Sequence, residues 1–168
     1  DVVAEILYIS ANALSSQSFY SVSSFYLNLA KYLNPKFISF ETLLAENFFR
    51  IENYKKSEQI YNKIKKEGSA YYWYSTKQKA KILKQLKKSD KAIKLMIENF
   101  ERLDIKGVYE KFDFAEFLKN NNKYEESIRH YSEVLKSINN DHPIFAEVTD
   151  GRGVAYERLG KWEEAEKD

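Results

Sequence analysis

The chain has 168 residues, of which 43% are hydrophobic, 31% are charged and 15% are aromatic, with only 5 Gly and 2 Pro. This composition excludes collagen-like and low-complexity disordered chains, which are rich in Gly and Pro and poor in aromatic residues. No segment approaches the run of about 18 apolar residues that a membrane span needs. With so few helix breakers, we expect long helices in an all-α domain.

The net charge is +2, but residues 50–94 hold 14 basic and 4 acidic residues, a local excess of +10. Such a block is either a solvated Lys-rich helix surface or a surface that faces a partner. The chain contains no cysteine, which excludes disulfides, thiolate metal sites and cysteine nucleophiles. We therefore expect no metal and no cofactor.

Five segments repeat one short pattern, in which an aromatic residue or Ser is followed three positions later by Ser or Ala. The small residues of the pattern are 34, 35, 35 and 38 positions apart, and they are Ser23, Ser57, Ala92, Ser127 and Ala165. This period is typical of a solenoid built from helix–turn–helix units. It divides the chain into repeats at about 4–37, 38–72, 73–107 and 108–145, with a partial repeat at 146–168.

Within each repeat, apolar residues at helical spacing predict two helices joined by a short polar turn. Between the two helices of the second repeat, Asn53 is expected to cap the second helix. Ser89-Asp90 and the run 120–122 of three Asn residues are expected to do the same in the third and fourth repeats. Leu159-Gly160 is expected to end a helix, because Gly tolerates a positive φ.

This pattern resembles the tetratricopeptide repeat (TPR) family, in which a large–small pair on the first helix precedes the small residue of the second helix. The matching pairs are Ser10-Ala11, Leu44-Ala45 and Phe114-Ala115, with Ala80 and Gly153 at the corresponding small positions. The resemblance covers nearly the whole chain and implies a right-handed superhelical solenoid. The chain departs from the family in lacking the first-helix Trp, since Glu41, Thr76, Lys111 and Thr149 stand near those places, and Lys79 replaces a large apolar residue.

The stretch 151–162 is the most family-like and is similar to the late repeats of long bacterial, alphaproteobacterial-type multi-TPR proteins. Since the chain also lacks an initiator Met, we expect a fragment of a longer protein. The sequence fixes no compartment, and the resemblance leans only slightly toward the bacterial periplasm or cell envelope over the cytoplasm.

The resemblance implies a concave groove lined by the first helix of each repeat. The candidate partner-binding residues on those helices are Phe49, Arg50, Tyr74, Lys77, Lys81, Lys84, Tyr109, Phe112 and Glu116. The middle of this groove would be basic and aromatic, which suits an extended acidic peptide or a carboxylate.

No motif in the chain predicts catalysis. It has no Gly-rich phosphate loop and no nucleophile elbow, and His130 with Glu126 and Glu133 lacks the further ligands of a metal site. We therefore expect a non-catalytic scaffold that binds a protein, as a peptide or helix, in its groove. The alternatives are nucleic-acid binding through the Tyr/Lys-rich third hairpin, which the weak net charge disfavours, and a regulatory appendage of an enzyme outside this chain.

Overall fold

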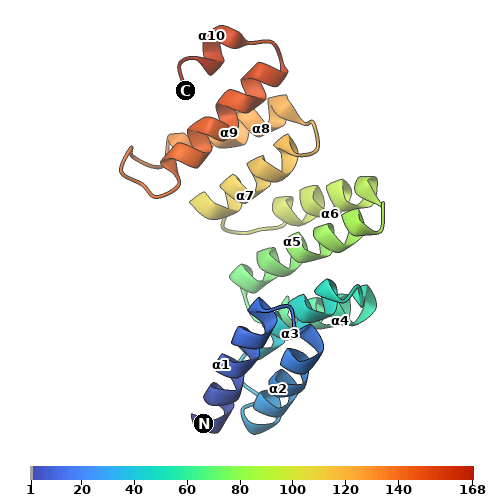
Figure 1. The fold of residues 1–168 in the computed structure, drawn as a ribbon. Helices are drawn as coiled ribbons and strands as arrows, with labels where there is room; N and C mark the ends of the chain where they lie inside the picture. Colours follow the sequence, from blue (N-terminus) through green and yellow to red (C-terminus); the bar gives the residue numbers. More distant parts are fainter. Residues whose placement is uncertain (1) are drawn as a thin grey trace. The chain divides into compact units, whose positions relative to one another are not determined.

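The computed structural model describes residues 2–168, and over this range the chain forms helices and no strand (Figure 1). The helices are α1 (Val2–Ser16), α2 (Tyr20–Leu33), α3 (Ser39–Arg50), α4 (Tyr54–Ile64), α5 (Ser69–Gln85), α6 (Ser89–Glu101), α7 (Val108–Lys119), α8 (Tyr124–Leu135), α9 (Phe145–Arg158) and α10 (Trp162–Ala165). Consecutive helices pack as hairpins, α1 on α2, α3 on α4, α7 on α8 and α9 on α10. The prediction of an all-α helical-repeat fold is confirmed.

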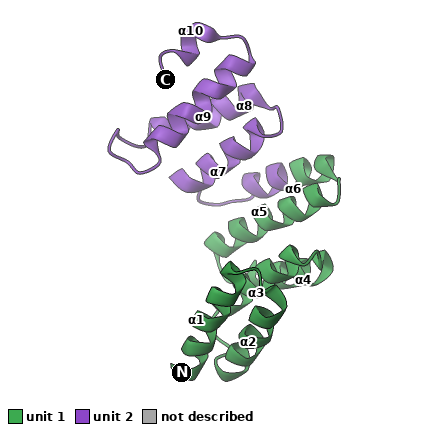
Figure 2. Cartoon of the chain, in the orientation of Figure 1, with its two compact units in different colours: residues 1–95 green, residues 96–168 purple. Residues whose placement is uncertain are grey.

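The chain divides into two compact units, residues 1–95 and residues 96–168, and the division falls within α6 (Figure 2). In the first unit α2 packs on α3 and α4 packs on α5, and in the second unit α8 packs on α9. Each unit is thus built from helices that contact their neighbours in the sequence.

The helix ends agree with most of the signals in the sequence. The side chain of Asn53 accepts a hydrogen bond from the backbone N–H of Lys56 at 3.3 Å, so this cap is confirmed. The expected Asn cap of α8 is wrong, because Lys123 occupies the N-cap position and Asn122 lies one residue earlier. The third repeat starts earlier than expected, because α5 begins at Ser69 and not at residue 73. The residue before this helix is Gly68, which has a φ of 132°.

A left-handed residue joins the two helices of every hairpin. These residues have φ between 58° and 73°, and they are Ser18, Glu52, Lys87, Asn122 and Gly160. Each stands five positions before the small residue of its repeat. The turn is therefore the same in all five repeats, although only the last repeat uses the glycine that this conformation favours.

In the first two hairpins the small residue of the second helix contacts the main chain of the first helix. Ser57 is fully buried, and its Oγ donates a hydrogen bond to the carbonyl of Ala45, twelve residues earlier on the preceding helix, at 2.8 Å. Ser23 makes the same bond to Ala11 at 2.7 Å. Because a main-chain oxygen of one helix lies within hydrogen-bond distance of the other, only a small side chain fits between them.

A buried amide links the first two hairpins. Asn47 of α3 is fully buried, accepts a hydrogen bond from the Ser15 hydroxyl at 2.7 Å and donates one to Ser23 Oγ at 2.7 Å. Ser23 in turn donates to Ala11, so the chain of hydrogen bonds runs through α1, α2 and α3. A polar group can be buried at this interface because all of these partners are in place.

Glu41 occupies one of the places where the TPR family has Trp, and it is buried between two lysines. Its Oε1 lies 2.8 Å from Lys31 Nζ of α2 and 2.5 Å from Lys63 Nζ of α4. Burial alone would raise the pKa of this carboxyl, but the hydrogen bonds and charges of the two lysines outweigh it and lower the pKa of Glu41 below its usual range. The ion pairs therefore join three helices where the family uses an aromatic side chain.

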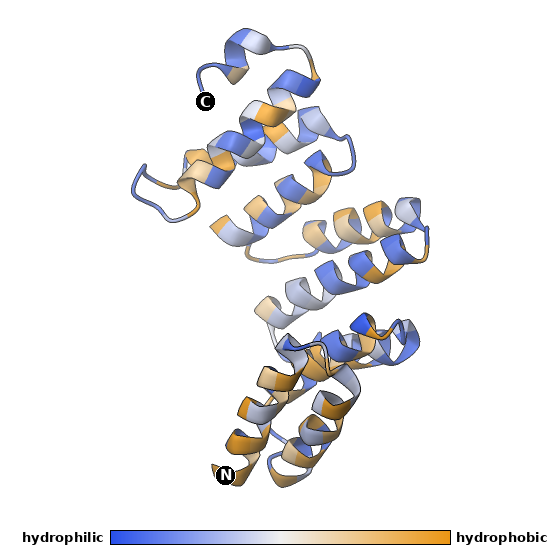
Figure 3. Cartoon of the chain, viewed as in Figure 1, coloured by the Kyte–Doolittle hydropathy of each residue, from blue (hydrophilic) through white to orange (hydrophobic). Residues whose placement is uncertain are grey.

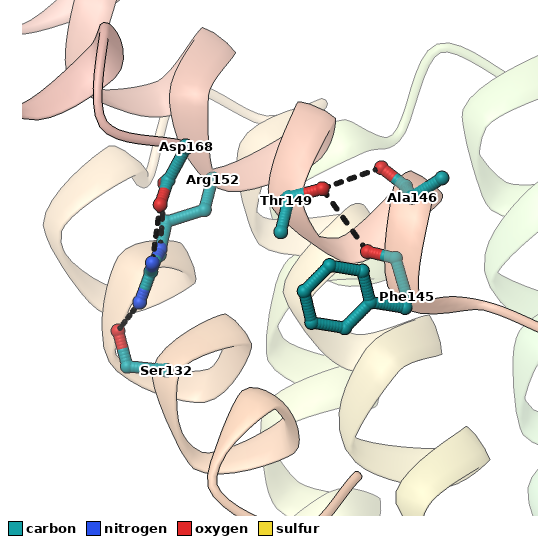
Figure 4. Close-up of polar contacts among 6 residues, drawn as sticks. All are labelled: Ser132, Phe145, Ala146, Thr149, Arg152 and Asp168. Carbon is teal, nitrogen blue, oxygen red and sulfur yellow. Dashed lines mark hydrogen bonds and ion pairs between the residues drawn. The ribbon is translucent and has the colours of Figure 1, made fainter. Parts of the chain in front are cut away.

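Thr149 stands at another position where the TPR family has Trp, and its hydroxyl forms hydrogen bonds within its own helix. It donates to the carbonyls of Phe145 at 3.1 Å and Ala146 at 3.0 Å (Figure 4). One turn later Arg152 pairs through two nitrogens with the carboxylate of Asp168 and donates to Ser132 Oγ of α8 at 3.1 Å. These contacts connect the end of the chain to α8 and α9.

In the second unit α9 packs closely on α8 at Gly151. A Cβ on Gly151 would lie 2.6 Å from the hydroxyl oxygen of Tyr131 and 3.0 Å from a carboxylate oxygen of Glu116. Tyr131 is fully buried and donates a short hydrogen bond to Glu116. The glycine is thus required by the close approach of these side chains.

Replacing Ser57 with Leu should lower the free energy of unfolding by about 1–3 kcal/mol, because the larger side chain must enter the closest contact between α3 and α4. Ser57→Ala, which loses only the hydrogen bond, should cost about 1 kcal/mol. Urea unfolding of both variants measures the difference, and equal stability of Ser57→Leu and the wild type would place this residue outside the contact.

Glu41→Gln should lower the free energy of unfolding at pH 7 by about 1–2 kcal/mol, a modest loss because Lys31 and Lys63 can turn toward solvent. Since the pKa of Glu41 is lowered in the folded state, its contribution is fully present above the unfolded pKa and disappears as the pH falls through the folded one. The difference between wild type and variant, measured by unfolding from pH 7 to pH 2, should therefore shrink at acid pH. A constant difference would contradict the ion-pair account.

Gly151→Ala should destabilise the chain by about 1–3 kcal/mol, although the same change in an open helix usually stabilises by about 1 kcal/mol. Gly153→Ala in the same helix is the matched control, because its nearest neighbours would lie 3.7 Å away. Thermal melts should thus shift in opposite directions for the two variants. If Gly151→Ala were instead more stable than the wild type, the side chain of Tyr131 would have to move aside at little cost in free energy.

Candidate functional site

A pocket of about 380 Å³ lies between α3, α4 and α5 of the first unit. It brings together four of the expected partner-binding residues, namely Phe49, Arg50, Lys81 and Lys84. The other lining residues are Glu46, Tyr61, Gln78 and Gln85. Three cationic side chains therefore meet one carboxylate at this pocket.

A second pocket, of about 300 Å³, lies between α1, α2 and α3. It shares Glu46 and Arg50 with the first pocket, and its remaining lining residues are Asn12, Ser15, Ser16, Tyr20 and Leu43. Arg50 Nη2 and Glu46 Oε1, 3.4 Å apart, form an exposed ion pair where the two pockets adjoin. The two pockets thus follow the first helices of the first three repeats, and we call them together the unit-one groove.

Two expected residues of α5 lie beside this groove rather than on its lining. Tyr74 is half-buried and packs edge-on against Tyr61, with ring centroids 5.9 Å apart. Burial, followed by the nearby charge of Glu46, raises the pKa of Tyr74 above its usual value. Lys77 is half-buried and does not line either pocket, whereas Gln78 and Gln85 do. Sequence reasoning missed these two glutamines, although they share a helix face with Lys81 at a spacing of three and four residues.

The remaining expected residues belong to α7 in the second unit. Tyr109 is exposed, with its ring 6.0 Å from the imidazole of His142. Phe112 packs at 6.3 Å from the ring of Tyr131, and Glu116 accepts hydrogen bonds from Tyr131 and from Lys119 Nζ, the latter at 2.6 Å. Glu116 therefore has a structural role in the second unit. That these three residues continue the unit-one groove stays a prediction.

A further pocket of about 440 Å³ lies within the second unit, between the last turn of α6, α7 and α8. Its apolar wall is an aromatic cluster in which Phe100 stacks on Phe114 at 4.0 Å and the His130 ring stands edge-on to both, at 5.3 and 5.1 Å. Burial lowers the pKa of His130 and outweighs the opposing charge of Glu133. The imidazole is thus mainly neutral at pH 7, and it packs against the rings of Phe100 and Phe114.

Residues 2–168 offer neither a metal cluster nor a membrane span. Among these residues no group of three or more His, Cys, Asp or Glu side chains is placed to hold a metal ion. None of the helices within this range combines the length and apolar character that crossing a bilayer requires.

No protein-family model and no curated protein matches this chain by sequence. Its fold, in contrast, matches several solved structures. The crystal structure of BtubC from P. vanneervenii aligns with a TM-score of 0.71 at 16% identity, over 97% of this chain and 75% of that one. A tetratricopeptide repeat protein from Parabacteroides merdae aligns with a TM-score of 0.65 at 17% identity, over 98% of this chain and 62% of that one.

YrrB, described as a TPR protein with an unusual peptide-binding site, aligns with a TM-score of 0.54 at 18% identity, over 96% of this chain and 80% of that one. At such low identity these alignments concern the fold alone. They agree with the 34- and 35-residue spacing of the small residues and with the hairpins built around them. The chain therefore has the tetratricopeptide repeat fold.

Proposed function

We propose that this chain is a non-catalytic interaction scaffold whose unit-one groove binds an extended acidic segment of a partner protein. The observation that carries the proposal is the pair of adjoining pockets along α1, α3 and α5, which share Glu46 and Arg50. Two adjoining pockets along successive helices suit a chain with side chains at intervals better than a single compact ligand.

The charges at the groove favour carboxylates. The lining carries three cationic side chains, Arg50, Lys81 and Lys84, and one carboxylate, Glu46, so its residues sum to a positive charge. The half-buried Phe49 supplies apolar surface beside these cations, and the buried ring of Tyr61 lies beneath them. Glutamate or aspartate side chains of a partner would thus gain charge-assisted hydrogen bonds while their backbone covers the ring of Phe49.

The test compares two double charge reversals of equal net charge. Lys81→Glu with Lys84→Glu changes the groove, whereas Lys55→Glu with Lys66→Glu changes two exposed lysines that line neither pocket. Binding of a labelled Glu-rich peptide, followed by fluorescence anisotropy, should weaken about ten-fold or more in the first variant and little in the second. Equal losses would identify a general electrostatic surface and refute the groove.

Two controls define the ligand. Raising the salt from about 0.1 M to about 1 M, which shortens the screening length from ~10 to ~3 Å, should weaken binding of the acidic peptide. A Lys-rich peptide of equal length should not bind. Tighter binding of a single-stranded oligonucleotide than of the acidic peptide would favour the nucleic-acid alternative instead.

A further inference from the structure

The two pockets of the unit-one groove differ in charge. We call the pocket between α3, α4 and α5 the α5 pocket and the pocket between α1, α2 and α3 the α1 pocket. Over residues 2–168, the cations that line the α5 pocket are Arg50, Lys81 and Lys84, and Arg50 alone lines the α1 pocket. Both pockets share Glu46, the one carboxylate that the described residues contribute to either lining. The lining charges therefore sum to a positive value in the α5 pocket and to zero in the α1 pocket.

Hydroxyl groups stand in the α1 pocket where the α5 pocket has lysines. They belong to Ser15, Ser16 and Tyr20, and each donates its hydrogen to another atom of this chain, at 2.7, 2.8 and 3.2 Å. A hydroxyl oxygen that has donated its hydrogen can still accept through its lone pairs. The hydroxyl groups of this pocket are thus placed to accept hydrogen bonds from a ligand rather than to donate them.

Glu46 adds a charged acceptor to the same pocket. Its side chain is 47% exposed, and the 3.4 Å ion pair with the exposed Arg50 is accessible to solvent. Ion pairs of this kind contribute little to stability, so Arg50 can leave Glu46 at low cost. Because Arg50 also lines the α5 pocket, a carboxylate bound there can take over the guanidinium and leave Glu46 to a second ligand group.

The helices that bear the two pockets differ in the same way. Figure 3 shows that the second half of α5 is mainly hydrophilic, whereas α1 is rich in apolar residues. Lysines at α5 thus offer hydrogen-bond donors with a positive charge, and α1 contributes short polar side chains within an otherwise apolar helix.

We propose that the α1 pocket binds a Lys or Arg side chain of the same partner segment whose acidic side chains meet Lys81 and Lys84. This inference rests on the proposed function and adds to it a second site with the opposite charge preference. An ammonium or guanidinium group carries hydrogen-bond donors and no acceptor, which matches a pocket of hydroxyl acceptors beside a carboxylate. The groove thus selects a segment with a defined order of charges, acidic beside α5 and basic beside α1.

Other side chains of the partner fit the α1 pocket less well. An acidic side chain would lie beside Glu46, and it would meet hydroxyl groups whose hydrogens are already donated. A neutral amide such as Gln could donate to the hydroxyl oxygens, but it would leave the charge of Glu46 without a counter-charge. The comparison of Lys with Gln at one position of the segment therefore isolates the role of Glu46.

The spacing of the helices sets the expected spacing of the two charges. The pockets lie on either side of α3, and packed helices are about 8–10 Å apart. An extended chain advances about 3.3 Å per residue. The basic residue is thus expected about three positions from the acidic residues that meet α5.

The test uses labelled peptides of equal length that differ at one position. The reference is Glu-rich, and the others replace the Glu three positions from an acidic pair with Lys or with Gln, on either side of the pair because the segment can run in either direction. In one direction the Lys peptide should bind the wild-type chain about two- to five-fold more tightly than the Gln peptide in fluorescence anisotropy, as a solvent-accessible ion pair allows. A general basic surface predicts the reverse order, because the Lys peptide has the smallest negative charge.

Three variants of the chain locate the effect. Glu46→Gln should abolish the preference for Lys over Gln. Glu52→Gln is the matched control and should keep the preference, since Glu52 is an exposed carboxylate of the same hairpin that lines neither pocket. Tyr20→Phe keeps the ring and removes one acceptor, so it should reduce the preference without changing the affinity for the Glu-rich peptide. Unchanged circular dichroism melts would show that the variants keep the fold.

The outcomes separate this inference from the proposed function. If the Glu-rich peptide binds but Lys brings no gain over Gln in either direction, or if the gain survives Glu46→Gln, the basic site in the α1 pocket is refuted and the acidic site stands. If none of the peptides binds, both proposals are refuted.

Discussion

In the first two hairpins, a contact between two small residues twelve positions apart sets the distance between the helices. Ser57 and Ala45, or Ser23 and Ala11, bring a side chain of one helix onto the main chain of the other. At this distance the flanking large side chains, such as Tyr61 and Ile64, lie in the groove beside the contact and become fully buried. The inter-hairpin interfaces in turn depend on this spacing, because each hairpin of a solenoid buries its apolar surface against its neighbours.

Polar side chains carry part of the packing between hairpins. Asn47 and Glu41 both lie on α3, and both are buried with partners on neighbouring helices. Two helices with purely apolar contacts can shift along each other at low cost. A buried amide or carboxylate that loses its hydrogen-bond partners in such a shift is left unsatisfied, which costs free energy. These two residues therefore favour one register of the second hairpin on the first, at some cost in hydrophobic burial.

The helical period and the small residues were predictable from the sequence because both are local and repeat. The roles of Asn47 and Glu41 were not, because their partners lie on other helices, 10 and 22 positions away for Glu41 and 24 and 32 positions away for Asn47. The groove was predictable in part. Lys81 and Lys84 line a pocket, and so does Gln78 rather than the adjacent Lys77, because neighbouring residues of an α-helix point about 100° apart. That a partner binds there stays a prediction.

The left-handed hairpin turns leave a set of positions that belong to no interface of the chain. In four of the five turns a residue with a Cβ adopts a conformation that disfavours branched side chains, and these residues are exposed at Ser18, Glu52, Lys87 and Asn122. Each turn lies in a different hairpin, so changes there are expected to act independently. Glycine at Glu52 or Lys87 should relieve steric strain, whereas at Ser18 or Asn122 it would also remove the hydrogen bond that the side chain accepts from Tyr20 or Tyr124. The turns at Glu52 and Lys87 thus offer a route to a thermostable form of the scaffold that keeps its groove.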